Sequence, residues 1–455
     1  MSTCPFTPPY PRPLASKAGL LRRFWRGWHS WVHTLFAQSY RMKMGQVRLP
    51  RLTLHVVNAP ELVEEIMADP GGAFPKHPLL ADMLEPLLGA SLFTANGPHW
   101  AAQRRMMGPA FAQAHLDRSF APMAAACAGL MADLAHADLA APLDIDPLMT
   151  HVTADVIMRT LFSTPLAEGP ARRLHRTFAR YQAWAQRAAL LGLYGLPGLG
   201  CGGRARRAGA EIRALFAPLV AARLQAPPPY PAQDMLDALI AARHPETGAP
   251  FSQGDLVDQA AILFLAGHET SATALTWALY LLAESPELQE RLHAEVGAVA
   301  GSGPIDAAAV KRLEGVRNLF REALRLYPPV SFLPRRAARG ALLRGRAVGP
   351  EDMLVISPWL IHRHADHWPC PHAFDPDRFA RPEGQAAAAH AFLPFGKGPR
   401  ICIGAGFAMQ EAVLILASVI RAYRLRYPAG PKPQLTSRLT LRPRHGMPLW
   451  LAPRG

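Results

Sequence analysis

Apolar residues recur at helical spacing along most of the chain. From about residue 98 onward they return every three or four positions, which predicts a series of helices. The run over 256–282 is apolar on nearly all sides, as expected for a helix through the centre of a protein. Turn-rich stretches at 195–204 and 226–234 interrupt the helices, and both are too short to link separate domains.

Segments with strand character are few and short. Residues 46–57 predict strands around a proline-marked turn, and Pro60 opens a predicted helix that runs through Met67. Residues 340–360 and 432–452 also have the composition of short strands. We therefore predict a mainly α, helix-rich single domain with small peripheral β-sheets.

Residues 19–39 predict an amphipathic helix with a tryptophan-rich face and a basic face. Two hypotheses account for the apolar face: it docks on the protein body, or it makes peripheral contact with a membrane surface. We divide the chain here into a proline-rich segment with this helix, residues 1–40, and a main domain, residues 41–455.

The composition is that of a compact globular protein, with 50% hydrophobic and 18% charged residues among 455. Five scattered cysteines without a CxxC pair argue against a disulfide framework and a structural zinc site, and predict reduced thiols. The proline-rich start of the chain does not resemble a secretory signal. Because no uninterrupted apolar run reaches about 18 residues, we expect no transmembrane segment and a cytoplasmic location.

The net charge of +15 comes mainly from arginine. Such a surface could contact nucleic acid, anionic lipid or an acidic protein. The chain has no lysine-rich tail, zinc-finger spacing or aromatic ribonucleoprotein box, so we expect no nucleic-acid partner. A compositional preference for arginine and an acidic electron-donating partner remain as explanations.

The segment PFGKGPRICIGAG, residues 394–406, surrounds Cys402 with glycines. Glycines permit tight turns and leave amide groups free to bond a sulfur, which stabilises its thiolate form. Phe395 is an apolar cover for the sulfur, and Arg400 could reach an anionic group. The helix expected after Gly404 has its positive end toward Cys402. A cysteine in a glycine loop is, by itself, more often an ordinary buried thiol.

The whole pattern F-x-x-G-x-R-x-C-x-G resembles the heme-binding loop of the cytochrome P-450 superfamily, with every position filled. Further motifs resemble that family in the expected order: HWAAQRR with Trp100 and Arg104, AGHETSA with Gly267, Glu269 and Thr270, FREALRLYPP with Glu322 and Arg325, LPRRAA with Arg335, and FDPDRF with Arg378. The resemblance runs from about residue 46 to the C-terminus and implies the single-domain cytochrome P-450 fold. The motifs look most like the branch with fatty-acid hydroxylases and microsomal enzymes.

The resemblance implies heme b as cofactor, with Cys402 as the iron ligand. It implies that three further residues of the loop bind the cofactor, namely Phe395, Arg400 and Gly404. It also makes Trp100, Arg104 and Arg335 contacts of the heme propionates, although the neighbouring Arg336 leaves the last assignment open. Glu322, Arg325 and Arg378 would form a structural ion network.

For the distal side, the resemblance implies that Thr270 and Glu269 deliver protons for the activation of O2. A hydroxyl backed by a carboxyl group can relay protons. Alternatively, Thr270 bonds a carbonyl of the preceding helical turn and has only a structural role. Gly267 would leave room for O2 beside the heme.

The implied function is a monooxygenase that inserts one oxygen atom of O2 into a hydrophobic substrate, such as a fatty acid, a terpene or an aromatic compound. Electrons would come from NAD(P)H through separate proteins, an acidic ferredoxin or flavodoxin with its reductase, docked near Arg104 and Arg105. We expect a monomer with a mobile lid at 195–204. The alternatives are a peroxygenase or hydroperoxide isomerase on the same fold and a heme-based gas sensor, and the relay residues argue against both.

Overall fold

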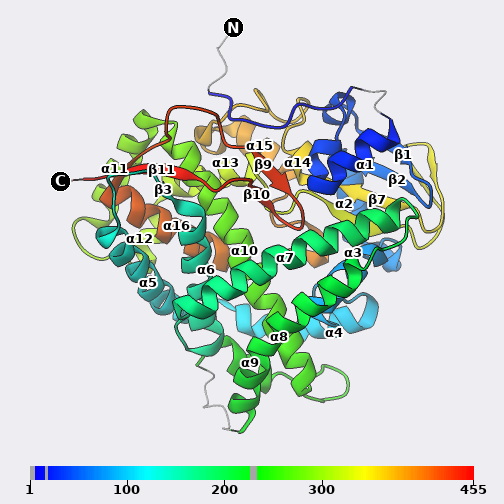
Figure 1. Cartoon of the computed structure of the whole chain (residues 1–455), viewed down its shortest axis with the longest axis horizontal. Coiled ribbons are helices and arrows are strands. Elements are labelled where there is room, and N and C mark those ends of the chain that lie inside the picture. Colours follow the sequence, from blue (N-terminus) through cyan, green and yellow to red (C-terminus); the bar gives the residue numbers. More distant parts are fainter. Residues whose placement is uncertain (1–5, 16–18, 226–232, 455) are drawn as a thin grey trace.

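The computed structural model describes residues 6–15, 19–225 and 233–454. These form a mainly helical body with small sheets, as predicted (Figure 1). The α-helices are α1 (Leu20–His29), α2 (Pro60–Ala68), α3 (Pro78–Leu88), α4 (Gly97–Met107), α5 (Gln113–His136), α6 (Ile145–Phe162), α7 (Glu168–Leu193), α8 (Cys201–Gln225), α9 (Met235–Ala241), α10 (Gln253–Ala283), α11 (Pro286–Ala300), α12 (Ala307–Arg312), α13 (Glu314–Leu326), α14 (Pro358–Ile361), α15 (Pro382–Ala391) and α16 (Ala405–Ala422).

The strands form small sheets away from the helical centre, in the upper part of Figure 1. They are β1 (Met44–Arg48), β2 (Thr53–Val57), β3 (Leu143–Asp144), β4 (Leu333–Arg336), β5 (Ala341–Leu343), β6 (Arg346–Val348), β7 (Met353–Ile356), β8 (Tyr423–Arg426), β9 (Leu435–Ser437), β10 (Leu441–Pro443) and β11 (Pro448–Pro453). The largest sheet has the order β1-β2-β7-β4, with β2 and β7 parallel. Most of the strands fall in or overlap the three segments that the sequence predicted, whereas β3, β4 and β8 lie outside them.

Helix α10 is the central helix, as its apolar sequence predicted. Ser252 caps its N-terminus in a reciprocal arrangement with Asp255. Almost all of its residues are buried, because α6, α8, α13 and α16 pack around it. This burial holds the motif AGHETSA in the interior, next to the segments that carry the other motifs.

Helix α16 follows the Cys402 loop and is also part of the core. It is long and apolar enough to cross a membrane, but most of it is buried inside the protein against α5, α10, α11 and α13. Its length and composition are therefore those of a core helix.

The amphipathic helix expected over residues 19–39 is shorter than predicted. Helix α1 ends at His29 because Ser30 is extended, and two 3-10 turns follow, Trp31–Thr34 and Ala37–Tyr40. The Ser30 hydroxyl accepts a hydrogen bond from the Ser437 amide, which ties this segment to β9. Two apolar residues of α1 remain exposed, Leu21 (72%) and Trp25 (57%).

The structure also differs from the predictions for the cysteines and for the turn-rich break at 195–204. Cys370 is disulfide-bonded, so the prediction that all five thiols are reduced is wrong, whereas Cys127, Cys201 and Cys402 are free. The turn-rich break at 195–204 is shorter than expected because α8 begins at Cys201. The second predicted break, 226–234, lies for the most part outside the described residues.

Candidate active site

A cavity of about 890 Å³ lies between α10 and the Cys402 loop. Three segments of the chain contribute apolar side chains to it. Residues 79–93 contribute Leu79, Leu80, Met83, Leu84, Leu88, Leu92 and Phe93, residues 178–193 contribute Phe178, Ala189 and Leu193, and residues 330–332 contribute Val330 and Phe332. Predicted site residues from α4, α10, β4 and the Cys402 loop line the same cavity. The fold thus brings together motifs that are far apart in the sequence.

The loop before α16 is folded tightly around Cys402. The Cys402 amide donates to the carbonyl of Phe395 at 2.9 Å, which closes the turn. Gly398 has a left-handed backbone with φ of +72°, and a Cβ there would lie 2.4 Å from the carbonyl oxygen of Met67 in α2. Only glycine allows this close approach of the loop to α2. Phe395 lies on the cavity wall beside Cys402, as its predicted covering role requires.

The Cys402 side chain opens onto the cavity. Its surroundings are otherwise protein, and this burial raises the pKa of the thiol. The amide of Gly404, at the start of α16, and the guanidinium of Arg104 act in the opposite direction and favour the thiolate. A bound metal cation would favour the thiolate further.

Arg400 and Trp100 meet at one edge of the cavity. The guanidinium of Arg400 lies 4.1 Å from the centroid of the Trp100 ring. Arg400 also donates to the carbonyl of Ala95 at 3.1 Å and to the side-chain oxygen of Asn96 at 3.0 Å. Because Asn96 precedes α4, these bonds position the start of the helix that carries Trp100 and Arg104.

Arg335 lines the cavity and its neighbour does not. Only 5% of Arg335 is exposed, and it donates to the Met67 sulfur at 3.4 Å. Arg336 points the other way along β4 and pairs with Glu351 at 3.3 Å near the surface. The alternation of side chains along a strand therefore favours Arg335 for the predicted propionate contact.

Lys76 is a cavity residue that no motif indicated. It lies just before α3, is 9% exposed, and donates to the carbonyl of Phe93. Burial lowers the pKa of Lys76 well below its usual value, and Arg400 and Arg335 lower it further by repulsion. The signal in the sequence is weak, since one lysine after a proline has many structural explanations.

Lys76, Arg335 and Arg400 form a group of cations at the cavity wall, which we call the cation edge. Burial lowers the pKa of Arg335 to about 10, and Arg400 adds repulsion that Asp69 partly offsets. An anionic group inserted between these cations would relieve the repulsion and make charge-assisted hydrogen bonds. The carboxylates of heme b have this chemistry, so the residues present fit the expected cofactor.

Gly267 and Thr270 face the cavity from α10. A Cβ on Gly267 would lie 2.3 Å from the side chain of Ile157, so this glycine lets α6 approach α10 closely. Room for O2 at Gly267 stays a prediction. The Thr270 hydroxyl donates to the carbonyl of Ala266 at 2.6 Å, which is the bond to the preceding turn that the sequence left open.

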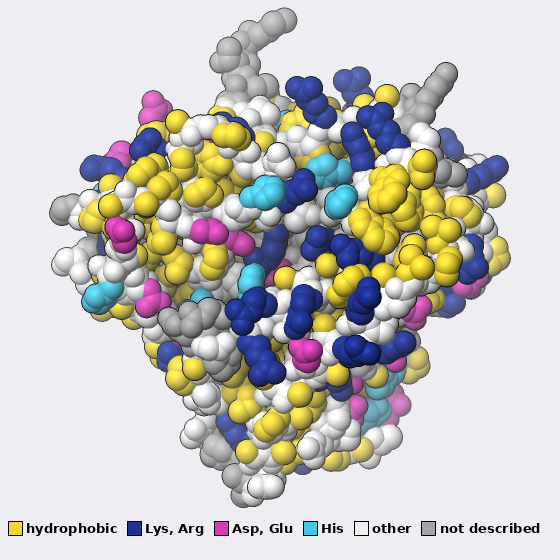
Figure 2. Space-filling model, viewed as in Figure 1, with side chains coloured by type: hydrophobic (Ala, Val, Ile, Leu, Met, Phe, Trp, Pro, Cys, Tyr) yellow, Lys and Arg dark blue, Asp and Glu magenta, His cyan; other side chains and the backbone are white. Residues whose placement is uncertain are grey.

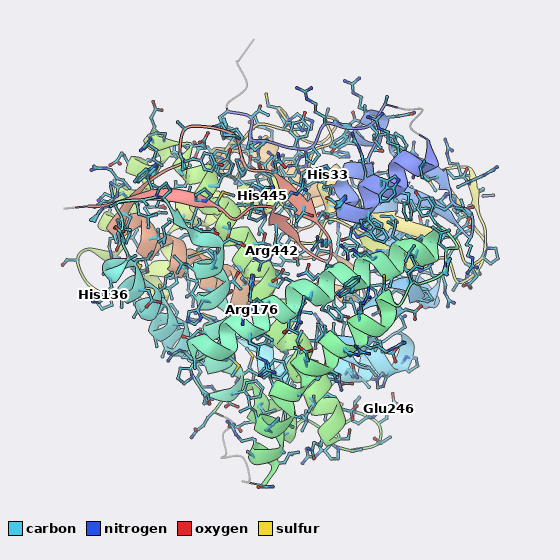
Figure 3. All side chains as sticks on the ribbon, in the orientation of Figure 1. His33, His136, Arg176, Glu246, Arg442 and His445 are labelled. Carbon is cyan, nitrogen blue, oxygen red and sulfur yellow. The ribbon has the colours of Figure 1, made fainter. Side chains whose placement is uncertain are left out.

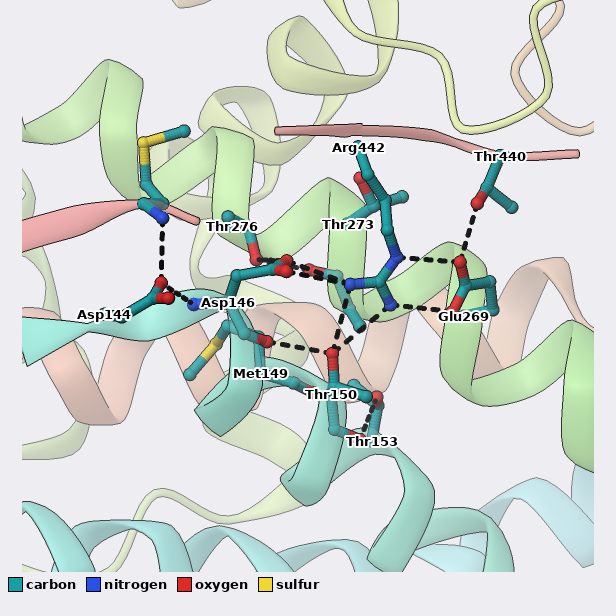
Figure 4. Close-up of polar contacts among 12 residues, drawn as sticks. Asp144, Asp146, Met149, Thr150, Thr153, Glu269, Thr273, Thr276, Thr440 and Arg442 are labelled. Atoms are coloured by element: carbon teal, nitrogen blue, oxygen red, sulfur yellow. Dashed lines mark hydrogen bonds and ion pairs between the residues drawn. The ribbon is translucent and has the colours of Figure 1, made fainter. Parts of the chain in front are cut away.

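Glu269 lies next to Thr270 but points into a buried ion network (Figure 4). Its carboxylate accepts from Arg442 at 2.7 Å on both oxygens, and from Thr440 and Gln182 at 2.6 and 2.9 Å. Arg442 donates from its other side to Asp146 at 3.0 Å. The network therefore joins α10, α6 and β10.

These partners determine the charge of Glu269. Burial raises its pKa, but Arg442 and the hydrogen bonds outweigh burial and lower the pKa to about 2. Glu269 is a carboxylate at neutral pH and holds no proton of its own to donate. Arg442 is part of β10, and Figure 3 shows it in the middle of the view, near α10. No motif pointed to Arg442 or Asp146, which are far from Glu269 in the sequence.

Glu322, Arg325 and Arg378 form the ion network that the motifs predicted. Glu322 accepts from Arg325 at 2.8 Å on both oxygens and from Arg378 at 3.1 Å. All three side chains are nearly or fully buried. Arg325 also donates to the carbonyls of His362, Pro371 and Ala373. The network joins α13 to the segment that leads to the Cys402 loop.

Basic side chains also gather on the surface. Figure 2 shows them over α7 and α8, in the middle of that face of the molecule. Arg105 follows Arg104 on α4, away from this group of basic side chains. Its side chain is 58% exposed and forms an ion pair with Glu246 at 3.5 Å. The side chain of Arg104 is half-buried and turned toward Cys402, so of the two arginines only Arg105 is open to a partner.

The chain is similar to known proteins over most of its length. A family model described as cytochrome P450 matches residues 7–449. The cyclooctatin synthase of Streptomyces melanosporofaciens is 33% identical over 86% of this chain and 85% of its own length. Cytochrome P450 CYP72A616 of Paris polyphylla is 32% identical over 85% and 77%. The cyclooctat-9-en-7-ol 5-monooxygenase of the same Streptomyces is 31% identical over 84% and 82%.

Proposed function

This chain belongs to the cytochrome P450 family of heme-dependent monooxygenases, and we propose that it adds oxygen to a terpene or terpenoid. Cys402 would hold the heme, which would supply the activation of O2 with electrons that partner proteins pass on from NAD(P)H. The remaining steps depend on the protein, which binds the substrate, excludes water and delivers protons. The observation that carries the proposal is the large apolar cavity beside Cys402.

The choice of a terpene over a fatty acid or an aromatic compound has two supports. The cavity wall formed by α3 and α7 is built of leucine, methionine, phenylalanine and alanine side chains, and α10 adds Ile262, Leu263 and Leu265, which together suit a bulky hydrocarbon. Two similar proteins are named for cyclooctatin chemistry, and one of these is named for oxygenation of an unsaturated alcohol. The lining side chains of α3 and α7 carry no charge that could pair with the carboxylate of a fatty acid; the arginines of the cavity lie on other parts of its wall.

The substrate class is tested by a ligand screen on the heme-loaded enzyme. Polycyclic terpenes and terpenoid alcohols are expected to shift the heme from low to high spin, because they displace water from the apolar cavity. Fatty acids of matched carbon number and small aromatic compounds serve as the comparison. Stronger shifts with fatty acids than with every terpene would contradict the proposed substrate class.

We propose that Thr270 is the hydroxyl that passes protons into the cavity, where the heme would activate O2. Its oxygen faces the cavity, and its bond to Ala266 holds the hydroxyl in one orientation. The hydroxyl oxygen can accept a proton, and the hydroxyl can pass its own proton onward once it turns away from the Ala266 carbonyl. The delivery of protons to Thr270 by Glu269 stays a prediction. For this role Glu269 would first have to give up its bonds to Arg442 and Thr440.

Thr270→Ala is expected to lower the amount of product formed per reductant consumed by about tenfold or more. Without the hydroxyl, protons arrive less selectively and electrons leave as hydrogen peroxide. Heme binding should be unchanged, since Thr270 is not part of the cation edge. The measurement is the ratio of product and peroxide to reductant. Thr160→Ala on α6 is the control, because the Thr160 hydroxyl also bonds the preceding helical turn, at Val156, but does not line the cavity. Unchanged coupling in Thr270→Ala would make Thr270 structural.

We further propose that the electron donor is an acidic ferredoxin or flavodoxin that docks near Arg105. Arg105 is exposed on the helix whose neighbouring residue, Arg104, lies beside Cys402. An acidic partner would compete with Glu246 for this guanidinium, and such association weakens as the salt concentration rises. Peripheral membrane contact through the exposed Leu21 and Trp25 of α1 stays a prediction.

A further inference from the structure

The cavity wall holds more arginines than the expected cofactor needs. The cation edge and Arg104 lie where the heme is expected, which leaves Arg23, Arg346 and Arg438 on the wall. Arg346 of β6 is exposed to solvent, whereas Arg23 and Arg438 are partly buried. A partly buried cation without a counter-ion is costly in a mainly apolar cavity. These two arginines therefore call for a ligand other than the heme.

Arg438, in the turn between β9 and β10, has no acidic partner among the described residues. Burial lowers its pKa, and the positive charges of Arg187 and Arg444 lower the pKa further. Glu269 is the only acidic residue among the described residues that line the cavity, and its carboxylate is already bound by Arg442. The charges near the Arg438 guanidinium are thus of the same sign as its own.

Arg23 of α1 lies toward the same end of the cavity. Its guanidinium lies 5.1 Å from the centroid of the Phe36 ring, and its buried Nε has no hydrogen-bond partner in the described part of the chain. The Thr436 hydroxyl of β9 donates to the carbonyl of His29, the last residue of α1, at 2.9 Å. Because β9 is bonded to the end of α1, Arg23 and Arg438 reach the cavity from neighbouring segments.

The turn that carries Arg438 is held in a fixed position. The Arg438 amide donates to the carbonyl of Thr440 at 3.0 Å, and the Thr440 hydroxyl donates to Glu269 of α10 at 2.6 Å. Glu269 directly precedes Thr270, which faces the cavity. A guanidinium on such a fixed turn loses little freedom when it binds a ligand. A group bound there would hold the ligand at a defined place along this wall.

We propose that Arg438, with Arg23 as a second cation, binds the carboxylate of a terpenoid acid. A planar guanidinium can donate two parallel hydrogen bonds to a carboxylate. The negative charge would also relieve the repulsion among Arg438, Arg187 and Arg444, while the apolar side chains of α3 and α7 cover the hydrocarbon skeleton. The inference rests on the proposed function and names the polar group of its substrate.

The skeleton and the carboxylate are separate requirements of this site. A fatty acid would offer Arg438 the same carboxylate, so a test of the charge must keep the skeleton constant and change only the polar group. Abietic acid, methyl abietate and abietinol form one matched set of acid, ester and primary alcohol. Geranic acid, methyl geranate and geraniol form a second set with a smaller skeleton.

The experiment titrates the heme-loaded enzyme with each compound and follows the shift from low to high spin. The wild type should bind the acid about tenfold or more tightly than the ester and the alcohol, because only the acid makes charge-assisted hydrogen bonds. Arg438→Ala should remove this preference and leave the dissociation constants of the ester and the alcohol nearly unchanged. Arg23→Ala should reduce the preference to a smaller extent. Equal affinities of the wild type for acid, ester and alcohol would overturn the proposal.

Arg444→Ala is the matched control. Arg444 directly follows β10, is exposed and does not line the cavity, so water and salt screen its charge. This variant should bind the acid like the wild type. Arg438→Lys keeps the charge without the planar fork and should retain part of the preference. An acid that binds Arg438→Ala as tightly as it binds the wild type would refute the assignment of Arg438.

Failure of this inference and failure of the proposed function give different results. Spin shifts with the esters and alcohols, and no tighter binding of the acids, would refute the carboxylate site and leave terpenoid oxygenation intact. Stronger shifts with fatty acids than with every terpenoid would refute the proposed substrate class together with the inference.

Discussion

Cys402→Ser is expected to abolish the carbon-monoxide difference band of thiolate-ligated heme, together with all O2-dependent product formation. Serine replaces the sulfur with a hydroxyl that stays protonated at neutral pH, because the Gly404 amide and Arg104 are too weak to ionise an alcohol. The electron donation by which a thiolate favours cleavage of the O–O bond is then lost. The measurement is the spectrum of the reduced protein with carbon monoxide.

The control for this substitution is Cys127→Ser. Cys127 is a free thiol as well, but it is buried against Ser418 between α5 and α16, and burial raises its pKa. The variant should keep the thiolate band and activity. A thiolate band that survives in Cys402→Ser would refute the ligand assignment.

Glu322→Ala is expected to destabilise the folded protein by about 3–5 kcal/mol, or to prevent folding. The substitution leaves two guanidinium groups, those of Arg325 and Arg378, buried without their carboxylate. Since the free energy of unfolding of a domain is about 5–15 kcal/mol, this is a large part of the total. Thermal unfolding followed by circular dichroism measures the loss, and heme content should fall with it.

A second glutamate with two arginine partners provides the control. Glu290 pairs with Arg424 and Arg454 at 3.1 and 2.9 Å, but its side chain is 52% exposed. Water solvates the charges that remain after Glu290→Ala, so the melting temperature should change little. Equal losses in the two variants would mean that burial of the Glu322 network contributes nothing.

The fold could be predicted from the sequence where one physical pattern dominates. Helix α10 is apolar on all sides because it is surrounded on all sides, and its capping residues mark its start. The Cys402 loop and the network of Glu322 were predictable because each motif is short and its residues have few alternative uses. The N-terminal helix was predicted too long, since the extended Ser30 owes its conformation in part to a distant partner in β9.

The parts of the site that were not predicted depend on contacts between distant segments. Arg442 is one arginine among many in the C-terminal region, and only the fold brings it to Glu269 and Asp146. Lys76 meets Arg335 and Arg400 in the same way.

The connection between Arg442 and the turn that precedes it has a consequence for redesign of the enzyme. Arg438, Leu439 and Thr440 reach the cavity from this turn, and Arg442 fastens the following strand to α6 and α10. The turn is therefore short, is held in place by Arg442, and brings one apolar side chain, that of Leu439, to the cavity. A library of substitutions at Leu439 can change the cavity volume available to new substrates while Arg442 keeps the turn in place. Randomising Thr440 or Arg442 instead would remove groups that bond the buried carboxylates of α6 and α10.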